Sequence, residues 1–352
     1  MRVLLVAPCL HDRRYGGVQK IGQIAWEAIA GSGTMERSEL LCYGRNCARN
    51  GRRSGDGERC VASKLAAALA ALRLRGRADF ILVWHLHMLQ LFPLLWRSGA
   101  RVGLFLHGIE CWRKPGADLE RWLPRVDFFL ANSRYTWERF VQNNPRWSRS
   151  EHFIAPLGIG EAVPAAPVPQ GRPAAFVVGR MDRSEDYKGH RQLIQAWPGV
   201  LEHVPEAELW IAGSGDLQPE LARLVEAGQL GHRVRFYGAI SEEEKEQLLT
   251  NCRCLAMPSR GEGFGLVYLE AMRLGRPCLV STLDAGREVV NPPEAGLAVD
   301  PDDPRAVADA VCRLLAPGEE WDRWSSSARR RYESCFTAAA FQRRLLQALS
   351  RL

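Results

Sequence analysis

The chain has 352 residues, of which 46% are hydrophobic and 25% are charged, so its length predicts two domains and its composition is typical of a soluble globular protein. It contains no run of 18 uncharged apolar residues, and its first apolar segment becomes charged too soon for a signal peptide, which argues against a membrane span and against export. The formal net charge of +7 is uneven, because residues 1–165 carry 24 Lys and Arg against 14 Asp and Glu.

The ten cysteines are scattered along the chain. They form one C-x-C pair and no C-x-x-C pair, so the spacing supports neither a zinc site nor the disulfide framework of a secreted protein. We therefore expect reduced thiols and a cytoplasmic location.

An apolar segment opens the chain at residues 2–7. A polar loop then reaches Gly16 and Gly17, and a helical pattern follows at residues 18–30. Strand, glycine turn and helix in this order are typical of a doubly wound α/β domain. A simple turn is the alternative interpretation of the glycines, because no G-x-G-x-x-G follows. The next predicted features are a basic loop within residues 44–57 and a helix at 61–74.

Histidines follow two predicted strands in this half. His85 and His87 end the apolar segment 78–87, where strand alternation would place both on one face. A metal pair is one interpretation, and strand-end histidines without a third ligand are the other. His107 follows the next predicted strand. Because ligands of open α/β sheets bind beyond the carboxyl ends of the strands, His107 is a candidate for substrate contact.

The first half ends in a strand at residues 126–132 and a helix at 135–142, with Ser133 as the predicted N-cap. Residues 156–173 contain crowded prolines and glycines without periodicity, which is typical of a linker. A second alternation of strands and helices begins after them. The pattern therefore predicts two α/β domains.

Two cations follow the first strand of the second half. Arg180 ends the apolar segment and Lys188 comes after a short polar loop. A planar guanidinium and a compact ammonium together supply two positive charges for a diphosphate, and solvated surface cations are the alternative interpretation. Gly213 and Gly238 each end a later strand, at the same predicted edge of the sheet.

Residues 258–277, PSRGEGFGLVYLEAMRLGRP, are the most informative stretch. Three glycines lead directly into a segment with helical periodicity, and such a loop at a helix N-terminus favours phosphate. Glu262 and Glu270 add carboxylates, which accept hydrogen bonds from neutral diols. The stretch predicts a site for a ligand that contains both phosphate and sugar.

Acidic residues after the last predicted strand form a D-x-D pattern with Asp300, Asp302 and Asp303. An N-capping turn before a helix from Arg305 explains these acids, so we expect no metal there. The tail, residues 323–352, carries seven arginines and one acid at helical spacing, which predicts an amphipathic helix with a basic face.

The stretch at 258–277 resembles the EX7E signature of GT4 retaining glycosyltransferases of the GT-B type, with Glu262, seven residues and Glu270 in the context EGFGLVYLEAM. The resemblance covers nearly the whole chain and is densest between Arg180 and Pro304. It implies an α/β GT-B fold of two Rossmann-like, doubly wound domains facing across a cleft. The implied parts are an acceptor-binding domain at 1–165, a nucleotide-sugar-binding domain at 166–330 and a C-terminal helix at 331–352 that crosses back to the first domain.

The resemblance also implies the reaction. The family moves a hexose from a nucleotide diphosphate sugar to a hydroxyl with retention, without a metal or another cofactor; GDP-mannose is the first choice of donor and a UDP-hexose the second. A glycan or lipid-linked acceptor in cell-surface polysaccharide synthesis is expected, and no nucleic acid. The basic N-terminal half predicts peripheral contact with anionic lipid at the inner face of the plasma membrane, and an arginine-rich solubilising surface is the alternative.

The family pattern further implies roles for single residues. The implied catalytic residues are Glu262, Arg180, Lys188 and His107, and the implied donor-binding residues are Glu270, Gly263, Phe264, Gly265, Leu266, Gly16, Gly17, Gly213 and Gly238. Glu270 would hold the ribose, and Glu262 would hold sugar hydroxyls together with the backbone of residues 263–266. Arg180 and Lys188 would neutralise the departing diphosphate, whose oxygen would take the acceptor proton.

Other classes of protein fit the sequence less well. A catalytically inactive sugar-nucleotide-binding protein is the main alternative. A nucleotide-dependent oxidoreductase is disfavoured by the missing G-x-G-x-x-G. A GT-B-like phosphorylase would need a pyridoxal-binding lysine and a much longer chain.

Overall fold

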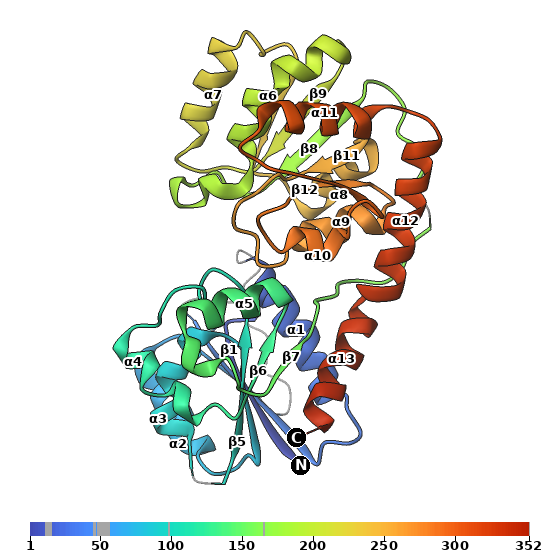
Figure 1. Cartoon of the computed structure of the whole chain (residues 1–352). Coiled ribbons are helices and arrows are strands. Elements are labelled where there is room, and N and C mark those ends of the chain that lie inside the picture. Colours follow the sequence, from blue (N-terminus) through green and yellow to red (C-terminus); the bar gives the residue numbers. More distant parts are fainter. Residues whose placement is uncertain (11–15, 45–46, 48–56, 98, 165, 352) are drawn as a thin grey trace. The chain divides into compact units, whose positions relative to one another are not determined.

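The computed structural model describes residues 1–352 except 11–15, 45–46, 48–56, 98, 165 and 352. The chain divides into two compact units, Met1–Ile159 with Ala338–Leu352, and Gly160–Thr337. Each unit contains one parallel sheet whose strands alternate with helices (Figure 1). The predicted doubly wound α/β class is confirmed.

The first unit has a seven-stranded sheet in the order β3-β2-β1-β4-β5-β6-β7. Its strands are β1 (Arg2–Pro8), β2 (Arg37–Tyr43), β3 (Glu58–Val61), β4 (Phe80–Val83), β5 (Arg101–Leu106), β6 (Phe128–Ala131) and β7 (His152–Ile154). Its helices are α1 (Gly17–Ala30), α2 (Lys64–Leu74), α3 (Phe92–Leu95), α4 (Ala117–Glu120), α5 (Arg134–Asn143) and α13 (Ala338–Ser350), with 3-10 turns η1 (Leu86–Leu91), η2 (Leu123–Arg125) and η3 (Pro145–Trp147).

The second unit has a six-stranded sheet in the order β10-β9-β8-β11-β12-β13. Its strands are β8 (Ala174–Val178), β9 (Glu208–Ala212), β10 (Val234–Gly238), β11 (Cys254–Ala256), β12 (Cys278–Ser281) and β13 (Gly296–Val299). Its helices are α6 (His190–His203), α7 (Gln218–Ala227), α8 (Glu242–Asn251), α9 (Leu266–Arg273), α10 (Gly286–Val290), α11 (Pro304–Leu315) and α12 (Glu319–Cys335), and η4 (Arg183–Lys188) is a 3-10 turn.

The central strands are apolar without alternation because both faces of each sheet are covered. Every residue of β4 and β6 is buried, as is every residue of β11 and β12. Sequence-predicted caps hold two of the helices. The Ser133 hydroxyl accepts from the backbone N–H of Thr136 at the start of α5. The Asp303 carboxylate accepts from two N–H groups at the start of α11, so the capping interpretation of this acidic turn is confirmed for Asp303.

The boundary between the units falls at Ile159 and Gly160, six residues before the expected position at 165. The start of the linker follows the second unit because its carbonyls accept hydrogen bonds there. The Glu161 carbonyl accepts from Arg273 at 2.9 Å and from the Tyr332 hydroxyl at 3.2 Å. These partners lie more than 100 residues away, so the linker's composition gives no sign of them.

The tail consists of two helices, not one amphipathic helix. Helix α12 ends at Cys335 and helix α13 begins at Ala338. The boundary between the two units falls between these helices. The return to the first unit therefore begins at 338, seven residues later than the expected 331. Helix α13 packs beside α1, with Phe341 against the Trp84 ring and the Gln342 amide donating to the Ile24 carbonyl (Figure 1).

Two elements of the first half differ from the sequence prediction. The helix expected at 61–74 begins at Lys64, because residues 58–61 form the edge strand β3. The strand expected at 78–87 ends at Val83, and His85 instead caps η1 by accepting from the His87 N–H at 3.2 Å. Strand alternation therefore does not relate the two histidines. The predicted basic loop lies mostly outside the described residues.

The cysteines are less scattered in space than in sequence. Cys42 on β2 and Cys60 on β3 are register partners, and the Cys42 thiol hydrogen-bonds those of Cys60 and Cys47. The Cys9 thiol also contacts Cys47. Strand order, which sequence spacing does not reveal, gathers these thiols, and none of the four is in a disulfide.

Candidate functional site

The two predicted cations of the second unit share one carboxylate. Arg180 lies just beyond the carboxyl end of β8, and Lys188 ends η4. Both form ion pairs with Glu185, and the Lys188 Nζ lies 2.5 Å from its Oε2. The side chain of Arg180 is 73% exposed, whereas those of Lys188 and Glu185 are 15% and 11% exposed. An anion of the same unit therefore holds the cation pair in place.

Backbone packing explains two glycines beside these cations. A Cβ on Gly179 would lie 2.9 Å from the Lys188 side chain, so a larger residue would displace the ammonium. Gly213 has φ +129°, and a Cβ there would lie 1.9 Å from the Gly179 carbonyl oxygen. Gly213 is therefore needed to bring the ends of β8 and β9 together, whatever else it does.

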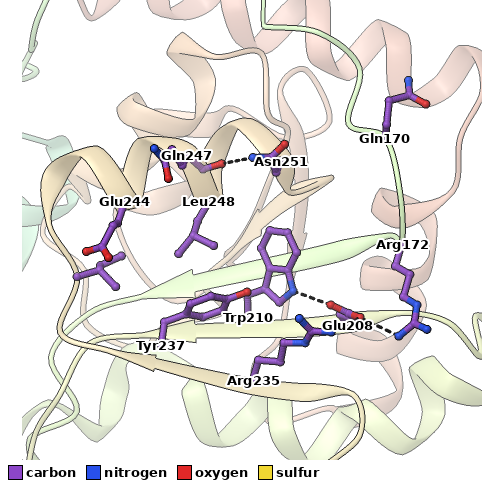
Figure 2. A pocket seen from close by; sticks show the side chains of 11 residues that line it. Gln170, Arg172, Glu208, Trp210, Arg235, Tyr237, Glu244, Gln247, Leu248 and Asn251 are labelled. Atoms are coloured by element: carbon purple, nitrogen blue, oxygen red, sulfur yellow. Dashed lines mark hydrogen bonds and ion pairs between the residues drawn. The ribbon is translucent and has the colours of Figure 1, made fainter.

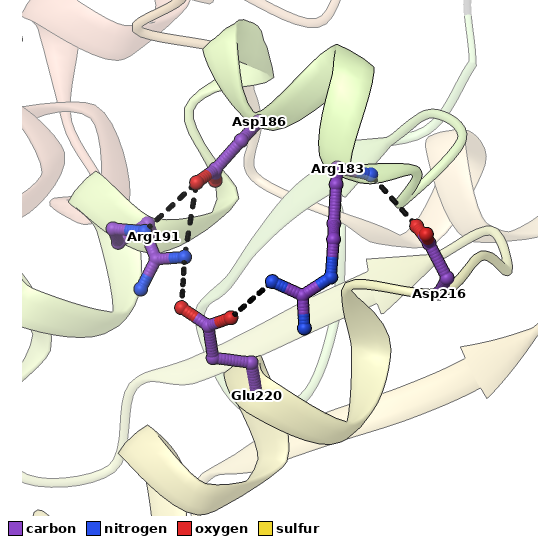
Figure 3. Close-up of polar contacts among 5 residues, drawn as sticks. All are labelled: Arg183, Asp186, Arg191, Asp216 and Glu220. Carbon is purple, nitrogen blue, oxygen red and sulfur yellow. Dashed lines mark hydrogen bonds and ion pairs between the residues drawn. The ribbon is translucent and has the colours of Figure 1, made fainter.

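A charged network holds the η4 turn that carries Lys188 (Figure 3). Arg191 on α6 donates to Asp186 at 2.9 Å and to Glu220 on α7 at 2.7 Å. Arg183 binds the other Glu220 oxygen at 3.1 Å, and its backbone N–H donates to Asp216 at 2.7 Å. Hydrogen bonding to Asp186 is the main reason that the pKa of Arg191 is raised. The turn is thus tied to both neighbouring helices.

The glycine loop of the EX7E stretch is built on a buried carboxylate. Asp284 is fully buried and accepts hydrogen bonds from the Ser259 hydroxyl, the Glu262 N–H at 3.1 Å and the Gly286 N–H at 2.9 Å. Gly265 follows as the N-cap of α9 with φ +83°, and a Cβ there would lie 2.4 Å from the Tyr268 ring. The loop is fixed from inside the unit.

Glu262 lies in an unusual electrostatic environment. Burial raises the pKa of its carboxyl to about 7; Asp284 and Glu185 raise it further, and Lys188 opposes them. Burial likewise raises the pKa of the Tyr187 hydroxyl, with Glu262 as the second cause. A carboxyl that titrates near neutral pH beside a cation pair is a candidate for direct contact with a ligand.

The second glutamate of the motif has a different partner. Glu270 on α9 forms an ion pair with Lys245 on α8 at 2.9 Å, and the same ammonium lies 2.9 Å from Glu242. Burial alone would lower the pKa of Lys245, but the two carboxylates raise it above its ordinary value. Glu270 is therefore oriented by a lysine that no sequence motif singled out.

The remaining predicted donor residues of the second unit offer mainly backbone. Phe264 is buried with its ring against Phe336, so its side chain serves packing. Gly263 and Leu266 are half-buried at the start of α9. Gly238 ends β10 with φ +68° and open space where a Cβ would stand. Its left-handed backbone, not crowding, favours glycine there.

His107 lies in the first unit, beyond the end of β5. Its Nε2 donates to the Trp84 carbonyl at 2.6 Å and its ring stacks on Phe105 at 4.6 Å. Its own carbonyl accepts from the Asn132 amide at 2.6 Å. Burial, helped by His85, lowers the pKa of His107 to about 3, so this imidazole is neutral at physiological pH. With the proton on Nε2, the other ring nitrogen, Nδ1, is a hydrogen-bond acceptor, and the imidazole carries no charge.

A carboxylate that the sequence reasoning passed over completes this strand end. Glu110 accepts from the N–H groups of His107 at 2.7 Å and Gly108 at 3.1 Å, and burial raises the pKa of its carboxyl. The sequence signal that could have identified Glu110 is its position three residues after His107.

Gly16 and Gly17 begin α1 at an exposed position, and Gly16 has open space around it.

The fold thus brings Arg180, Lys188 and Glu262 together in the second unit, with Glu185 between the cations. Glu270 is set apart by its own lysine, and His107 belongs to the other unit. Among the described residues, no cluster of three His, Cys, Asp or Glu side chains is arranged to hold a metal ion. Within the same residues, no helix is long and apolar enough to cross a membrane.

Comparison with known proteins identifies relatives of this chain. Residues 172–317 match the family model of Glycosyl transferases group 1. A phosphatidyl-myo-inositol mannosyltransferase of Mycobacterium leprae is 33% identical over 203 residues, which are 55% of this chain and 53% of that protein. A GDP-mannose-dependent monoacylated alpha-(1-6)-phosphatidylinositol monomannoside mannosyltransferase of Corynebacterium glutamicum is 30% identical over 205 residues, 54% of this chain and 53% of that protein. The chain thus covers about half the length of these relatives.

Solved structures resemble the whole chain in fold. Sucrose-phosphate synthase from Thermosynechococcus elongatus has a TM-score of 0.76 at 22% identity and covers 99% of this chain and 98% of its own. Anabaena HepE in complex with UDP and glucose has a TM-score of 0.72 at 15% identity, with 99% of both chains covered. The two sheets and these neighbours define a GT-B fold. The family match covers residues 172–317, so this part of the chain resembles the GT4-like glycosyltransferases, group 1.

Proposed function

We propose that the protein transfers a hexose from a nucleotide diphosphate sugar to an acceptor hydroxyl, with retention of configuration and without a metal ion. The observation that carries this proposal is the cluster of Arg180, Lys188 and Glu262 beyond the strand ends of the second unit. The match to the glycosyltransferase family model covers this same region.

Each side chain of the cluster has a role in this reaction. Arg180 and Lys188 exchange Glu185 for the diphosphate of the donor and stabilise the negative charge that grows as the sugar leaves. Glu262, with the backbone of residues 263–266, holds the hydroxyls of the hexose. Glu270 accepts from the ribose diol while Lys245 keeps its carboxylate oriented. The leaving phosphate oxygen takes the acceptor proton, so no protein nucleophile is required.

GDP-mannose is the preferred donor in this proposal, because the Corynebacterium relative is named as GDP-mannose-dependent and the Mycobacterium relative as a mannosyltransferase. A UDP-hexose is the second choice. The acceptor is a glycan or a lipid-linked sugar, bound by the first unit, where neutral His107 offers a hydrogen bond rather than a charge.

Peripheral contact with an anionic membrane is part of the proposal. The first unit carries 27 Lys and Arg against 13 Asp and Glu, or +14, whereas the second carries 20 against 27, or −7. The arginines of α12 belong to the acidic unit, so from the tail only Arg343, Arg344 and Arg351 add to the basic one. Sedimentation with anionic and neutral liposomes at low and high salt tests this contact. Equal recovery in the supernatant at low salt would leave a soluble acceptor.

A donor screen tests the central proposal. The purified protein is incubated with GDP-mannose, UDP-glucose, UDP-galactose and UDP-N-acetylglucosamine, and nucleoside diphosphate release is measured with the thermal shift that each donor causes. We expect release with one donor, above all GDP-mannose, and an α-linked product by NMR when an acceptor is supplied. If a donor raises the melting temperature but no nucleoside diphosphate is released with any of a set of acceptors, the protein is instead an inactive sugar-nucleotide-binding protein.

A further inference from the structure

The second unit contains a cavity that the proposed transfer reaction does not use. It has a volume of about 730 Å³ and lies between α8 and the outer strands β9 and β10 (Figure 2). Small-molecule sites commonly have volumes of roughly 300 to 1,000 Å³. None of Arg180, Lys188, Glu262 and Glu270 lines it.

Strand alternation creates the cavity wall. On β9, Leu209 and Ile211 are fully buried, so Glu208 and Trp210 point to the opposite face of the sheet. Trp210 is the register partner of Arg235 on β10, which places both side chains on this face. Helix α8 contributes the other wall with Glu244, Gln247, Leu248 and Asn251, which recur at helical spacing on one side.

Two aromatic rings form a corner in this cavity. The rings of Trp210 and Tyr237 are 6.1 Å apart between centroids and inclined at 70°. Tyr237 is 38% exposed, so its ring is accessible to solvent. The indole N–H of Trp210 donates to Glu208 at 3.0 Å, which fixes the orientation of this ring. A pair of fixed, accessible rings offers flat apolar faces to a ligand.

The charges around the rings cancel. Glu208 is 4% exposed and forms ion pairs with Arg172 at 3.1 Å and Arg235 at 3.0 Å. Despite its burial, these partners and Trp210 hold the pKa of Glu208 below its ordinary value. Glu244 supplies a second carboxylate, so two cations face two anions. An anionic ligand gains no net attraction here, whereas a neutral polar ligand finds donors and acceptors on all sides.

Side-chain amides complete the polar lining. Gln170, Gln247 and Asn251 contribute amides, each of which can both donate and accept. Among the hydrogen bonds of the described residues, none engages the side-chain amide of Gln247, and the Asn251 amide uses one N–H for the Gln247 carbonyl at 2.8 Å. Amides and anchored ions beside aromatic faces match the alternation of hydroxyls and C–H faces on a sugar ring.

We propose that this cavity binds a neutral carbohydrate chain, separately from sugar transfer, with the rings of Tyr237 and Trp210 against sugar C–H faces and the amides of α8 against hydroxyls. Such a site would hold a glycan on the surface of the second unit. It rests on the cavity alone and does not depend on the proposed transferase activity, because binding is measured without a donor.

Binding of α-mannotriose and maltotriose to the whole protein, by saturation-transfer NMR and calorimetry, tests the proposal. We expect millimolar affinity of the wild type for at least one of them. Tyr237→Ala should weaken it about tenfold, which corresponds to about 1.4 kcal/mol, because the ligand loses an aromatic face. Tyr237→Phe should retain binding, and Gln247→Ala should weaken it severalfold.

Two matched variants make the result specific. Leu69→Ala removes an exposed apolar side chain of α2 in the first unit, and Lys188→Ala alters the cation pair. Both should bind the trisaccharides like the wild type. The proposal would be overturned if the wild type bound neither trisaccharide at concentrations well above millimolar. It would also be overturned if folded Tyr237→Ala bound them like the wild type. Loss of binding in Lys188→Ala would move the sugar to the donor region and also overturn it.

Discussion

Both units place polar side chains beyond the carboxyl ends of a parallel sheet, but these side chains are uncharged in the first unit and charged in the second. Beyond the strand ends of the first unit, burial lowers the pKa of His107 to about 3 and that of His85 to about 4, so the groups there are uncharged bases. Beyond those of the second unit, Arg180 and Lys188 form ion pairs with Glu185, and the pKa of Glu262 rises to about 7. A position at a strand end thus fixes where a side chain lies, while burial and neighbouring charges fix its chemistry.

The difference fits two kinds of ligand. Paired cations suit the diphosphate of a donor, and neutral imidazoles with amides suit the hydroxyls of an acceptor. The formal charges, +14 for the first unit and −7 for the second, do not follow this local chemistry. The acidic unit holds the proposed anion site, so local pairing rather than overall charge decides what binds there.

The largest expected effect comes from removing the cation pair. Arg180→Ala and Lys188→Ala should each lower turnover about 100-fold or more, with a smaller loss of donor affinity, because they act on charge that grows as the diphosphate leaves. Steady-state kinetics with the donor found in the screen measure this. Arg223→Ala, at an exposed arginine of α7, is the matched control and should behave like the wild type. Full activity in either single variant would contradict the diphosphate role.

Glu270→Ala should weaken nucleoside diphosphate binding about 10- to 100-fold, because the ribose diol loses a charged acceptor that contributes roughly 1.5 to 3 kcal/mol. Calorimetric titration of the diphosphate into each protein measures the change. Lys245→Met should produce a smaller loss, since it frees the Glu270 carboxylate without deleting it. Wild-type affinity in Glu270→Ala would refute the assignment.

Glu262 predicts a pH dependence of stability. Because its folded-state pKa of about 7 lies above the ordinary value of 4.5, the folded protein binds this proton more tightly between the two values. Its stabilising contribution is present at low pH and is lost as the pH rises through about 7. Urea unfolding from pH 4.5 to 8 should show the wild type losing, relative to Glu262→Gln, on the order of 1 to 3 kcal/mol. Parallel curves for the two proteins would show that burial does not raise this pKa.

The smallest expected effect is that of metal chelation. Arg180 and Lys188 supply the positive potential that a divalent ion would otherwise provide, so transfer should continue unchanged in EDTA. Activity with and without added magnesium, after dialysis against chelator, measures this. A complete loss that magnesium restores would mean that the second unit needs a metal after all, and the contrast drawn between the units would fail.

Much of the site was accessible from local patterns. The glycine loop at 261–265 and the cations after β8 stand at positions that strand and helix periodicity locate, because the carboxyl ends of parallel strands lie along one edge. Ser133 and Asp303 could be identified as caps because a cap involves residues only two or three positions apart.

Partners distant in sequence were not accessible in this way. Lys245 reaches Glu270 from another helix, and Asp284 supports the Glu262 loop from beyond β12. Glu185 was missed for a different reason. It lies in a polar loop, where acidic side chains are usually solvated. In the structure its side chain is only 11% exposed and lies between two cations. Charge pairing of this kind depends on burial, which the sequence of one loop does not state.

The sequence by itself determined the doubly wound class, the glycine loop, the cation positions and the caps, because each depends on periodicity or on neighbours within a few residues. Tertiary structure alone decided the boundary at Gly160, the division of the tail at Ala338 and the neutral state of His107. It also decided the aromatic corner of Trp210 and Tyr237. These depend on which elements pack together and on how far each group is removed from water, and packing joins residues that no local pattern relates.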